Sequence, residues 1–295
     1  MLKNIATLTF ENSREQAERF STYLDIPCYT AKTHKFPDEE ILLTLPTDLP
    51  EHLIVFRSLH QPNDKIIEIL LAAKTALKHN VKRLTLIAPY LCYMRQDIEN
   101  HPGEAISQQI IGELLASTFD DVITVDSHLH RISHLSQAIP LKNAINIMAT
   151  GPMSEFLQDK CDNAIIFGPD GESEQWVKQI AEEINVDYAV ATKVRSGDKH
   201  VDIHLPDKDF SDKNIVIVDD MASTGRTISL ATKLLKKAGA KTVTALVTHA
   251  LFMGDAKDVM LKNGVDKIWS TDTITDTSNK IKLHKLLGDT FKTIL

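Results

Sequence analysis

The chain has 295 residues, of which 43% are hydrophobic and 25% charged, enough apolar material for one large domain or two of ordinary size. These fractions are typical of globular proteins and exclude a disordered chain or a small disulfide-stapled scaffold. Acidic residues outnumber basic ones by 40 to 33, and the net charge of −7 argues against a protein whose main partner is nucleic acid.

The sequence carries no signal for an oxidising compartment or for a membrane. Its cysteines match neither a Cys-x-x-Cys pair nor zinc-ligand spacing, so we expect reduced thiols at Cys28, Cys92 and Cys161. The N-terminal segment MLKNIATLTF lacks the apolar core and cleavage site of a signal peptide. No run approaches the roughly 18 apolar residues of a membrane helix. We therefore expect a cytoplasmic protein.

Short apolar runs alternate with helical patterns along the chain. In order, the predicted strands are HLIVF (52–56), LTLIA (84–88), VITV (122–125), AIIFG (164–168), YAVAT (188–192), IVIV (215–218) and VTALVT (243–248). Helical periodicity predicts helices over 64–79, 104–117, 173–184 and 226–238. This alternation indicates an α/β fold with mainly parallel sheets covered on both faces, in which ligands bind beyond the carboxyl ends of the strands.

An internal repeat predicts two similar α/β halves. With a shift of 159 residues, seven positions of segment 71–94 are identical to their counterparts in 230–253. Glycine and proline interrupt the pattern near 142–152. We therefore expect two tandem domains, 1–145 and 146–295.

The segment VDSHLHR (125–131) places possible metal ligands after a predicted strand. Residues two apart in an extended strand share a face, so Asp126, His128 and His130 would point the same way. Such oxygen and nitrogen ligands suit a metal site, and His134 lies nearby. On the residues alone, a zinc or iron hydrolase and ordinary surface histidines both remain open.

Two further segments place charged residues at strand ends. In FGPDGES, Asp170 precedes a glycine, and the structural reading is a turn followed by a helix capped by Ser173. In TKVRSGDKH, Lys193 and Arg195 follow a predicted strand, where such charges are usually only solvated.

The segment IVIVDDMASTGRTI (215–228) raises the sharpest question. Asp219 and Asp220 stand together where the apolar strand ends, and two adjacent acids repel each other unless something binds them. The following loop is rich in hydroxyls, contains Gly225 and opens a helix, which is a natural seat for a phosphate. A sugar phosphate offers both hydroxyls and a phosphate. An ordinary turn with a Ser or Thr N-cap explains the hydroxyls but not the paired acids.

VIVDDMASTGRT resembles the phosphoribosyl-diphosphate binding loop of type I phosphoribosyltransferases and of ribose-phosphate pyrophosphokinases. The resemblance implies that Asp219 and Asp220 hold the ribose hydroxyls. It implies that the 5-phosphate is held by Ser223, Thr224, Gly225 and Thr227. Arg226 stands where many members have glycine, and we expect its side chain to face solvent.

Other segments favour the pyrophosphokinases among these relatives. APYLCYMRQD (88–97) resembles their ATP-binding segment, which implies nucleotide contacts from Arg95, Gln96 and Asp97. KFPDEE (35–40) resembles a loop that reaches the ATP of a neighbouring subunit, which implies at least a dimer and contacts from Phe36, Asp38 and Glu40. Glu39 replaces a common glycine there. QPNDKIIEILL, VTHALFMGDA and STDTI match further family segments in order.

The same resemblance assigns the remaining charged residues. It implies that His128 helps to bind the Mg²⁺ of Mg-ATP and that Asp170 lies at the sugar and metal site. It places Lys193 and Arg195 in a flexible catalytic loop that closes on the triphosphate, where the cations offset charge and the closed loop excludes water. It assigns no role to His130 or Arg131.

The sequence is thus identified as a member of the ribose-phosphate pyrophosphokinase family, with two tandem type I phosphoribosyltransferase-like domains. No G-x-x-x-x-G-K-[ST] and no G-x-G-x-x-G occurs, so other residues must bind nucleotide. The expected reaction transfers the diphosphoryl group of ATP to ribose 5-phosphate in a homo-oligomer. The ATP site and oligomer contacts are expected in the first domain, with the last helix packing back on it, and the sugar site in the second. A phosphoribosyltransferase and a non-catalytic regulatory homologue are the alternatives.

Overall fold

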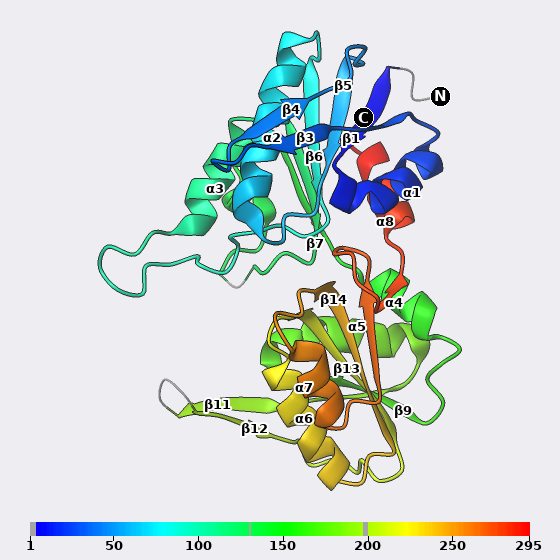
Figure 1. Ribbon diagram of the computed structural model, residues 1–295. Helices are drawn as coiled ribbons and strands as arrows, with labels where there is room; N and C mark the ends of the chain where they lie inside the picture. Colours follow the sequence, from blue (N-terminus) through cyan, green and yellow to red (C-terminus); the bar gives the residue numbers. More distant parts are fainter. Residues whose placement is uncertain (1–3, 130, 197–199) are drawn as a thin grey trace. The chain divides into compact units, whose positions relative to one another are not determined.

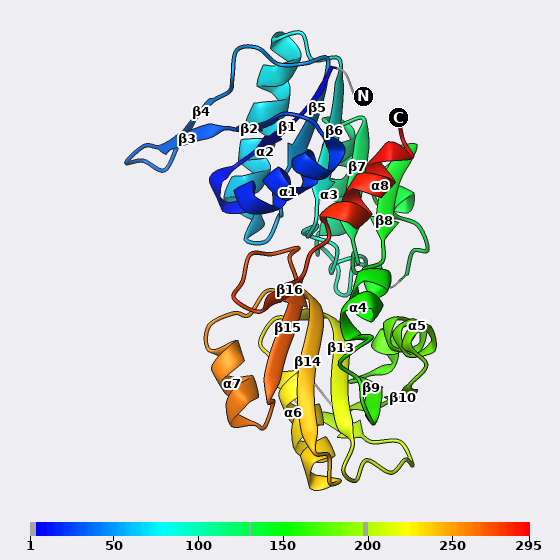
Figure 2. The same cartoon turned by 90° about the vertical axis from the view of Figure 1, so that its right-hand side faces the viewer.

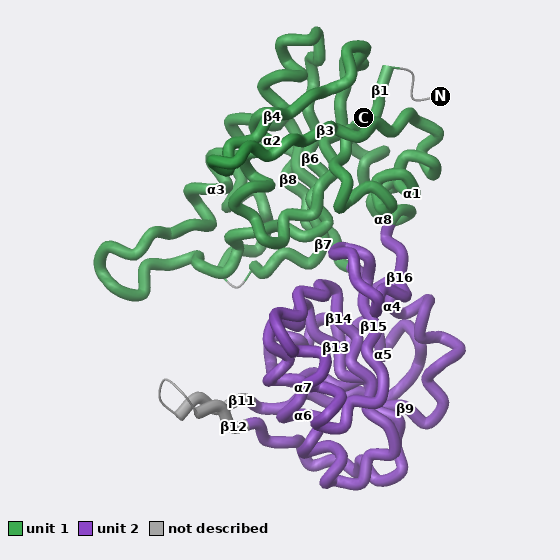
Figure 3. Tube along the Cα trace, in the orientation of Figure 1, with its two compact units in different colours: residues 1–148, 284–295 green, residues 149–283 purple. Residues whose placement is uncertain are grey.

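The computed structural model describes residues 4–129, 131–196 and 200–295, with the backbone alone at 193–196 and 200–202. The chain divides into two compact units, which Figure 3 colours separately. The first unit comprises residues 1–148 and 284–295, and the second comprises 149–283. The expected boundary at residue 145 falls inside the last strand of the first sheet, so that unit continues to Met148.

A six-stranded parallel sheet forms the centre of the first unit (Figure 1). Its strand order is β2-β1-β5-β6-β7-β8. Its strands are β1 (Ile5–Thr9), β2 (Cys28–Thr30), β5 (His52–Phe56), β6 (Arg83–Ala88), β7 (Asp121–Val125) and β8 (Asn143–Ile147). The helices are α1 (Arg14–Leu24), α2 (Pro62–Lys78), α3 (Ser107–Ala116) and α8 (His284–Lys292), with short turns η1 (Glu11–Ser13) and η2 (Leu135–Gln137). An antiparallel hairpin, β3 (Lys32–Lys35) and β4 (Ile41–Thr44), stands apart from the sheet.

Alternate residues of β5 face opposite layers of the first unit. Leu53 and Val55 belong to the core that includes α2 and α3. Phe56 points to the other layer, where its ring centre lies 5.5 Å from that of Phe20 on α1. The ring centre of Phe291 on α8 lies 6.2 Å from that of Phe20, and Figure 2 shows α8 beside α1. The last helix therefore completes the hydrophobic cover of the first sheet.

The second unit repeats this architecture with the strand order β10-β9-β13-β14-β15-β16. Its strands are β9 (Ala164–Gly168), β10 (Asp187–Val190), β13 (Asn214–Ala222), β14 (Thr242–Ala250), β15 (Lys267–Thr271) and β16 (Asn279–Ile281). The helices are α4 (Thr150–Leu157), α5 (Glu174–Ile184), α6 (Arg226–Lys237) and α7 (Ala256–Lys262), with the turn η3 (Gly171–Ser173). The hairpin of β11 (Thr192–Ser196) and β12 (His200–His204) lies outside the sheet. In Figure 2, α6 and α7 lie on one side of the sheet and α4 and α5 on the other.

The repeat extends well beyond the segment in which the sequence revealed it. In each short turn, the N–H of the last residue donates to the carbonyl of the residue that precedes the turn. Ser13 N lies 2.9 Å from the Phe10 carbonyl oxygen, and Ser173 N lies 3.3 Å from the Asp170 carbonyl oxygen. Helices α1 and α5 end on left-handed residues with nearly equal φ, 55° at Asp25 and 54° at Asn185. The predicted pair of similar α/β domains is confirmed.

All seven predicted strands and four predicted helices are present, but two local predictions were wrong. Strand β13 does not end before the paired acids; it continues through them to Ala222. Strand β7 does end at Val125, and Asp126 has a φ of 38°, which breaks the strand alternation expected for the histidines. Several further elements, among them β1 and α1, were not predicted from the sequence. Within the described ranges, no helix has the length and hydrophobicity needed to cross a membrane.

Candidate active site

Three carboxylates of the second unit meet at the carboxyl edge of its sheet. Strands β9 and β13 are parallel neighbours, with Phe167 opposite Ile217, and β13 contacts η3. Asp170 follows β9 by two residues, so it reaches the same edge as Asp219 and Asp220. Asp220 is only 6% exposed, and its backbone N–H donates to Asp219 Oδ1 at 3.0 Å. The fold thus brings the predicted acids together at one edge.

Asp170 caps the short turn η3 that precedes α5. Its extended backbone places Oδ1 3.2 Å from the donating N–H of Glu172. Ser173 is the N-cap residue of α5, as predicted, but its side chain makes no capping hydrogen bond. Its hydroxyl instead donates to the Asp170 carbonyl at 2.6 Å, because the turn brings the two residues together. The predicted N-cap position is therefore confirmed, and the Asp170 carboxylate holds the turn.

The loop after β13 leaves the first turn of α6 without a side-chain cap. Gly225 is the N-cap residue, with a left-handed φ of 68° and no capping hydrogen bond. A Cβ at this position would lie 2.8 Å from Met260 Cγ and 3.1 Å from the Ala256 carbonyl oxygen, so only glycine fits. The ordinary N-cap explanation for the hydroxyls of this loop therefore fails. Arg226 is exposed at the first helical position, as predicted.

A pocket of about 720 Å³ opens beside Asp170. Such a volume suits a small phosphorylated ligand. Its wall continues into the start of the β11–β12 hairpin, and it is lined by Asp170, Gly171, Glu172, Glu174, Val190, Ala191 and Thr192. Lys193 and Arg195 lie on β11, where their backbones pair with Ile203 and Val201. Their side chains lie outside the described part of the chain. The hairpin with both cations therefore begins at the pocket.

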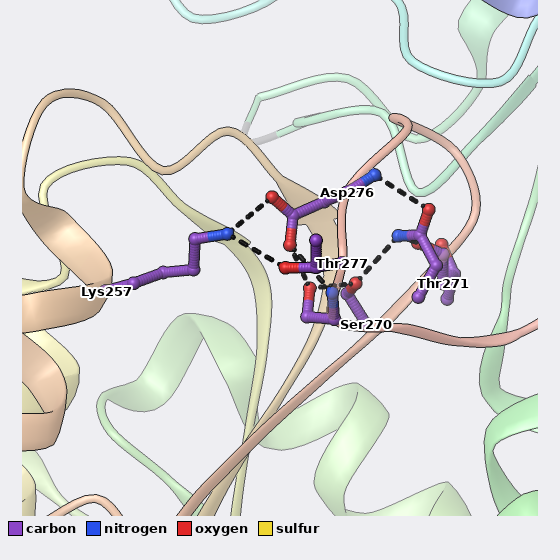
Figure 4. Close-up of polar contacts among 7 residues, drawn as sticks. Lys257, Ser270, Thr271, Asp276 and Thr277 are labelled. Atoms are coloured by element: carbon purple, nitrogen blue, oxygen red, sulfur yellow. Dashed lines mark hydrogen bonds and ion pairs between the residues drawn. The ribbon is translucent and has the colours of Figure 1, made fainter.

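Elsewhere in the second unit, polar groups hold together the turn between β15 and β16 (Figure 4). Asp276 accepts hydrogen bonds from Lys257 Nζ at 2.8 Å and from the Ser278 hydroxyl at 2.7 Å. Burial is the largest single influence on the pKa of Asp276 and raises it. The donors Lys257 and Ser278 together outweigh burial and hold this pKa below its usual value. Asn279 Nδ2 donates to Ser270 Oγ at 2.9 Å. This network anchors the turn that contains the STDTI segment.

In the first unit, the segment after β6 contains the residues predicted to contact nucleotide. Arg95 is exposed. The Gln96 amide donates to the Ile98 carbonyl at 2.9 Å, inside its own loop. Asp97 Oδ1 accepts from Arg131 Nη1 at 2.6 Å, a contact that the sequence did not indicate. The structure thus joins this segment to the loop after β7.

The loop after β7 gives no support to a zinc or iron site built on strand alternation. Asp126 is buried and His128 is half-buried, while His130 lies outside the described residues. His134 precedes turn η2, and its backbone N–H donates to Gln137 Oε1 at 3.2 Å. Over the part of the chain that the structure covers, no group of three His, Cys, Asp or Glu residues could hold a metal ion. The left-handed backbone at Asp126 therefore breaks the alternation on which the predicted Asp-x-His-x-His site depended.

The KFPDEE segment forms the tip of the β3–β4 hairpin. Phe36 is half exposed, and its N–H donates to the Glu40 carbonyl at 2.8 Å. Asp38 Oδ1 accepts from Glu40 N at 3.2 Å. Glu39 has a φ of 74°, a left-handed conformation that glycine adopts without strain. This conformation explains why glycine is common at the matching position of the family that the sequence resembles.

The first unit carries different residues at the positions of the acids. Phe56 of β5 pairs with Ile87 of β6, and Val218 of β13 pairs with Leu246 of β14. When these two pairs are aligned, Arg57 takes the position of Asp219. Phe10 precedes turn η1 as Asp170 precedes η3. Arg57 is 3% exposed and ion-paired with Glu68, and burial lowers its pKa to about 10. The equivalent edge of the first sheet is therefore filled by the protein itself.

Comparisons with known proteins agree with this two-unit architecture. Residues 5–118 match the family model of the N-terminal domain of ribose phosphate pyrophosphokinase, and residues 143–282 match that of the phosphoribosyl transferase domain. The ribose-phosphate pyrophosphokinase of Saccharolobus solfataricus is 33% identical over 87% of this chain and 89% of its own. That of Sulfurisphaera tokodaii is 30% identical over 90% and 91%. The crystal structure of phosphoribosylpyrophosphate synthetase from Mycobacterium smegmatis has the same fold, with a TM-score of 0.81, 23% identity and 99% coverage of both chains.

Proposed function

The chain belongs to the ribose-phosphate pyrophosphokinase family, and we propose that the junction of β13 and α6 is its sugar-phosphate site. The family reaction transfers the diphosphoryl group of ATP to the 1-hydroxyl of ribose 5-phosphate, giving 5-phosphoribosyl 1-diphosphate and AMP for nucleotide biosynthesis. One observation carries the proposal: two adjacent carboxylates stand a short loop away from a helix N-terminus without a side-chain cap.

The two ends of the sugar phosphate need opposite kinds of partner. Asp219 and Asp220 accept hydrogen bonds from the ribose hydroxyls, since ionised carboxylates are acceptors only. The 5-phosphate lies against the positive end of the α6 dipole, where uncapped N–H groups and loop hydroxyls donate to it. We assign this phosphate contact to Ser223, Thr224, Gly225 and Thr227.

The transfer step moves charge onto oxygens that the protein must stabilise. The 1-hydroxyl oxygen of ribose 5-phosphate bonds to the β-phosphorus of ATP, and the hydroxyl loses its proton. The bond from that phosphorus to the bridging oxygen of the α-phosphate breaks, and AMP leaves with this oxygen. We assign Lys193 and Arg195 to the charge on the transferred group, because their hairpin begins at the pocket beside Asp170.

The nucleotide-binding residues are proposed to lie in the first unit. Arg95, Gln96 and Asp97 follow β6, and in parallel sheets ligands bind beyond such strand ends. The hairpin tip supplies Phe36, Asp38 and Glu40 to the ATP of a neighbouring subunit, which makes the active form a homo-oligomer. The exposed aromatic ring and acids of this tip support that role. Free thiols and the use of ATP fit the cytoplasm.

The residues present fit a divalent cation of the Mg²⁺ type. Mg²⁺ retains several waters and binds through one or two carboxylates together with substrate phosphates, so it needs no dedicated cluster of protein ligands. Asp170 supplies a carboxylate in the wall of the pocket. We assign Asp170 as a metal ligand at the sugar site and, separately, His128 as a ligand of the Mg²⁺ that ATP carries. When bound, Mg²⁺ neutralises charge on the triphosphate.

The decisive experiment mixes the protein with ATP, Mg²⁺ and ribose 5-phosphate and follows AMP by chromatography. We expect AMP and 5-phosphoribosyl 1-diphosphate in equal amounts, and a large loss of turnover in Lys193→Ala. A protein that makes no AMP but consumes 5-phosphoribosyl 1-diphosphate with a nucleobase would be a phosphoribosyltransferase. A protein without either activity would support the regulatory alternative.

A further inference from the structure

We propose that Arg131 and Gln108 are positioning residues that hold Arg95 in place for the nucleotide. The inference rests on the proposed nucleotide role of segment 95–97 and adds residues that the family resemblance did not assign. Both residues come from other parts of the first unit. Arg131 lies in the loop after β7, and Gln108 is the second residue of α3.

Gln108 clamps the backbone on both sides of Arg95. Its side-chain Nε2 donates to the Met94 carbonyl at 3.2 Å. Its backbone N–H donates to the Gln96 carbonyl at 3.1 Å. Gln108 is almost fully buried, so these bonds are shielded from competition by water. The residues before and after Arg95 are therefore fixed to the start of α3.

The chain just before this clamp is anchored as well. Tyr93 has a left-handed φ of 60°, a conformation that non-glycine residues adopt only when their surroundings enforce it. Its hydroxyl donates to Asn63 Oδ1 at 2.6 Å, which ties it to the first turn of α2. Met94 is buried in the core. Arg95 is thus the exposed residue next to a rigid stretch.

The ion pair of Asp97 and Arg131 closes the other side of the segment. The Asp97 side chain is only 5% exposed, while that of Arg131 is 54% exposed, and the bond between Nη1 and Oδ1 measures 2.6 Å. A buried carboxylate needs a partner for its charge, so loss of Arg131 would release Asp97 from this position. The pair also links the segment to the loop that carries His128. Asp97 therefore acts through its pairing with Arg131.

A clamped backbone below an exposed guanidinium favours nucleotide binding. Arginine pairs with phosphate through a planar fork, and fixing its backbone in advance lowers the entropy lost on binding. If the clamp opens, Arg95 remains present but samples positions away from the phosphate. The expected effect is weaker binding of ATP with the sugar site unchanged.

The test compares Arg131→Ala, Asp97→Asn and the double variant with the unaltered protein. We expect each to raise the KM for ATP by about tenfold, because a misplaced contact costs roughly this factor or more. The KM for ribose 5-phosphate should stay within twofold. The double variant should lose no more than either single one, because both break the same pair. Arg14→Ala is the matched control, since Arg14 also pairs with an acid, Glu18 at 2.7 Å, on an exposed helix.

Two measurements separate this inference from its premise and from a general loss of structure. If Arg95→Ala leaves the KM for ATP unchanged, the proposed nucleotide role of the segment fails. If Arg95→Ala raises it but Arg131→Ala does not, only the positioning role is overturned. A parallel rise of both KM values with a lower Tm in Arg131→Ala would also overturn it. Gln108→Ala should reproduce the ATP-specific effect, and calorimetry with a non-hydrolysable ATP analogue should show the same loss of affinity.

Discussion

The guanidinium carbon of Arg57 lies 4.0 Å from the centre of the Phe10 ring. These residues occupy the positions in the first unit that Asp219 and Asp170 occupy in the second. The two units thus share their strand order but differ at this edge, with two acids in the second unit and a cation beside an aromatic ring in the first. The acids of the second unit belong to the proposed sugar and cation site, whereas Arg57 of the first unit pairs with Glu68. The edge of the first sheet is therefore filled by the protein, and the matching edge of the second is the proposed ligand site.

Replacing Arg57 should therefore destabilise the protein. Arg57→Ala leaves the nearly buried Glu68 carboxylate without its partner and removes a cation from the Phe10 ring. Breaking one side of a buried ion pair costs about 3 kcal/mol in free energy of unfolding. Denaturant unfolding, followed by circular dichroism, measures this loss. The exposed Arg14→Ala should leave the stability nearly unchanged, because exposed ion pairs contribute little. An equally small effect at Arg57 would contradict a buried structural pair.

The paired acids should behave in the opposite way. Asp219→Asn removes one of two neighbouring like charges, so stability should stay the same or rise by up to about 1 kcal/mol. Activity should nevertheless fall by on the order of a hundredfold, because the amide replaces a charged acceptor for the ribose hydroxyls. Thermal unfolding tests the predicted stability, and the KM for ribose 5-phosphate tests the predicted loss of substrate binding. A variant that loses stability and activity together would argue that the acids serve the fold.

Gly225 should tolerate no side chain. Gly225→Ala places a Cβ 2.8 Å from Met260 Cγ at a φ of 68°, so the loop or α7 must shift. We expect a weaker ribose 5-phosphate affinity, by about tenfold or more. Gly254→Ala is the matched control, since Gly254 has a φ of 59° but nothing within 4 Å of the new Cβ. It should show only the backbone cost, about 1 kcal/mol, with normal sugar affinity. Equal effects at both positions would refute the packing argument.

Local signals explain which features the sequence could predict. The strand around Val216 is apolar on both faces because both are covered, and the acids after it stood out against that run. The bond between Asp97 and Arg131 joins loops after different strands, so no local pattern reports it. The correspondence of Arg57 with Asp219 appears only when the strand registers of the two units are compared. The left-handed Asp126 reverses a prediction that assumed an extended chain.

Acid should destabilise the first unit through His52. Its Nε2 lies 2.8 Å from the Thr85 hydroxyl, which itself donates to Asp121, so His52 is the donor in this bond. Burial, followed by the charge of Arg83, lowers the pKa of His52 to about 4, below the value near 6.5 of the unfolded chain. The unfolded state therefore binds the proton first as the pH falls, and stability is lost progressively between about 6.5 and 4.

The loss from His52 should reach up to about 2 kcal/mol at pH 5 relative to pH 7.5. His52→Gln keeps a donor for the Thr85 hydroxyl but cannot titrate, so it should be less stable at neutral pH and show a smaller loss on acidification. Denaturant unfolding at several pH values between 4.5 and 7.5 measures how steeply the free energy of unfolding falls with pH in the unaltered protein and in His52→Gln. His79, an exposed residue at the end of α2, provides the control, and His79→Gln should keep the full pH dependence. If His52→Gln leaves the slope unchanged, the neutral buried imidazole is not its source.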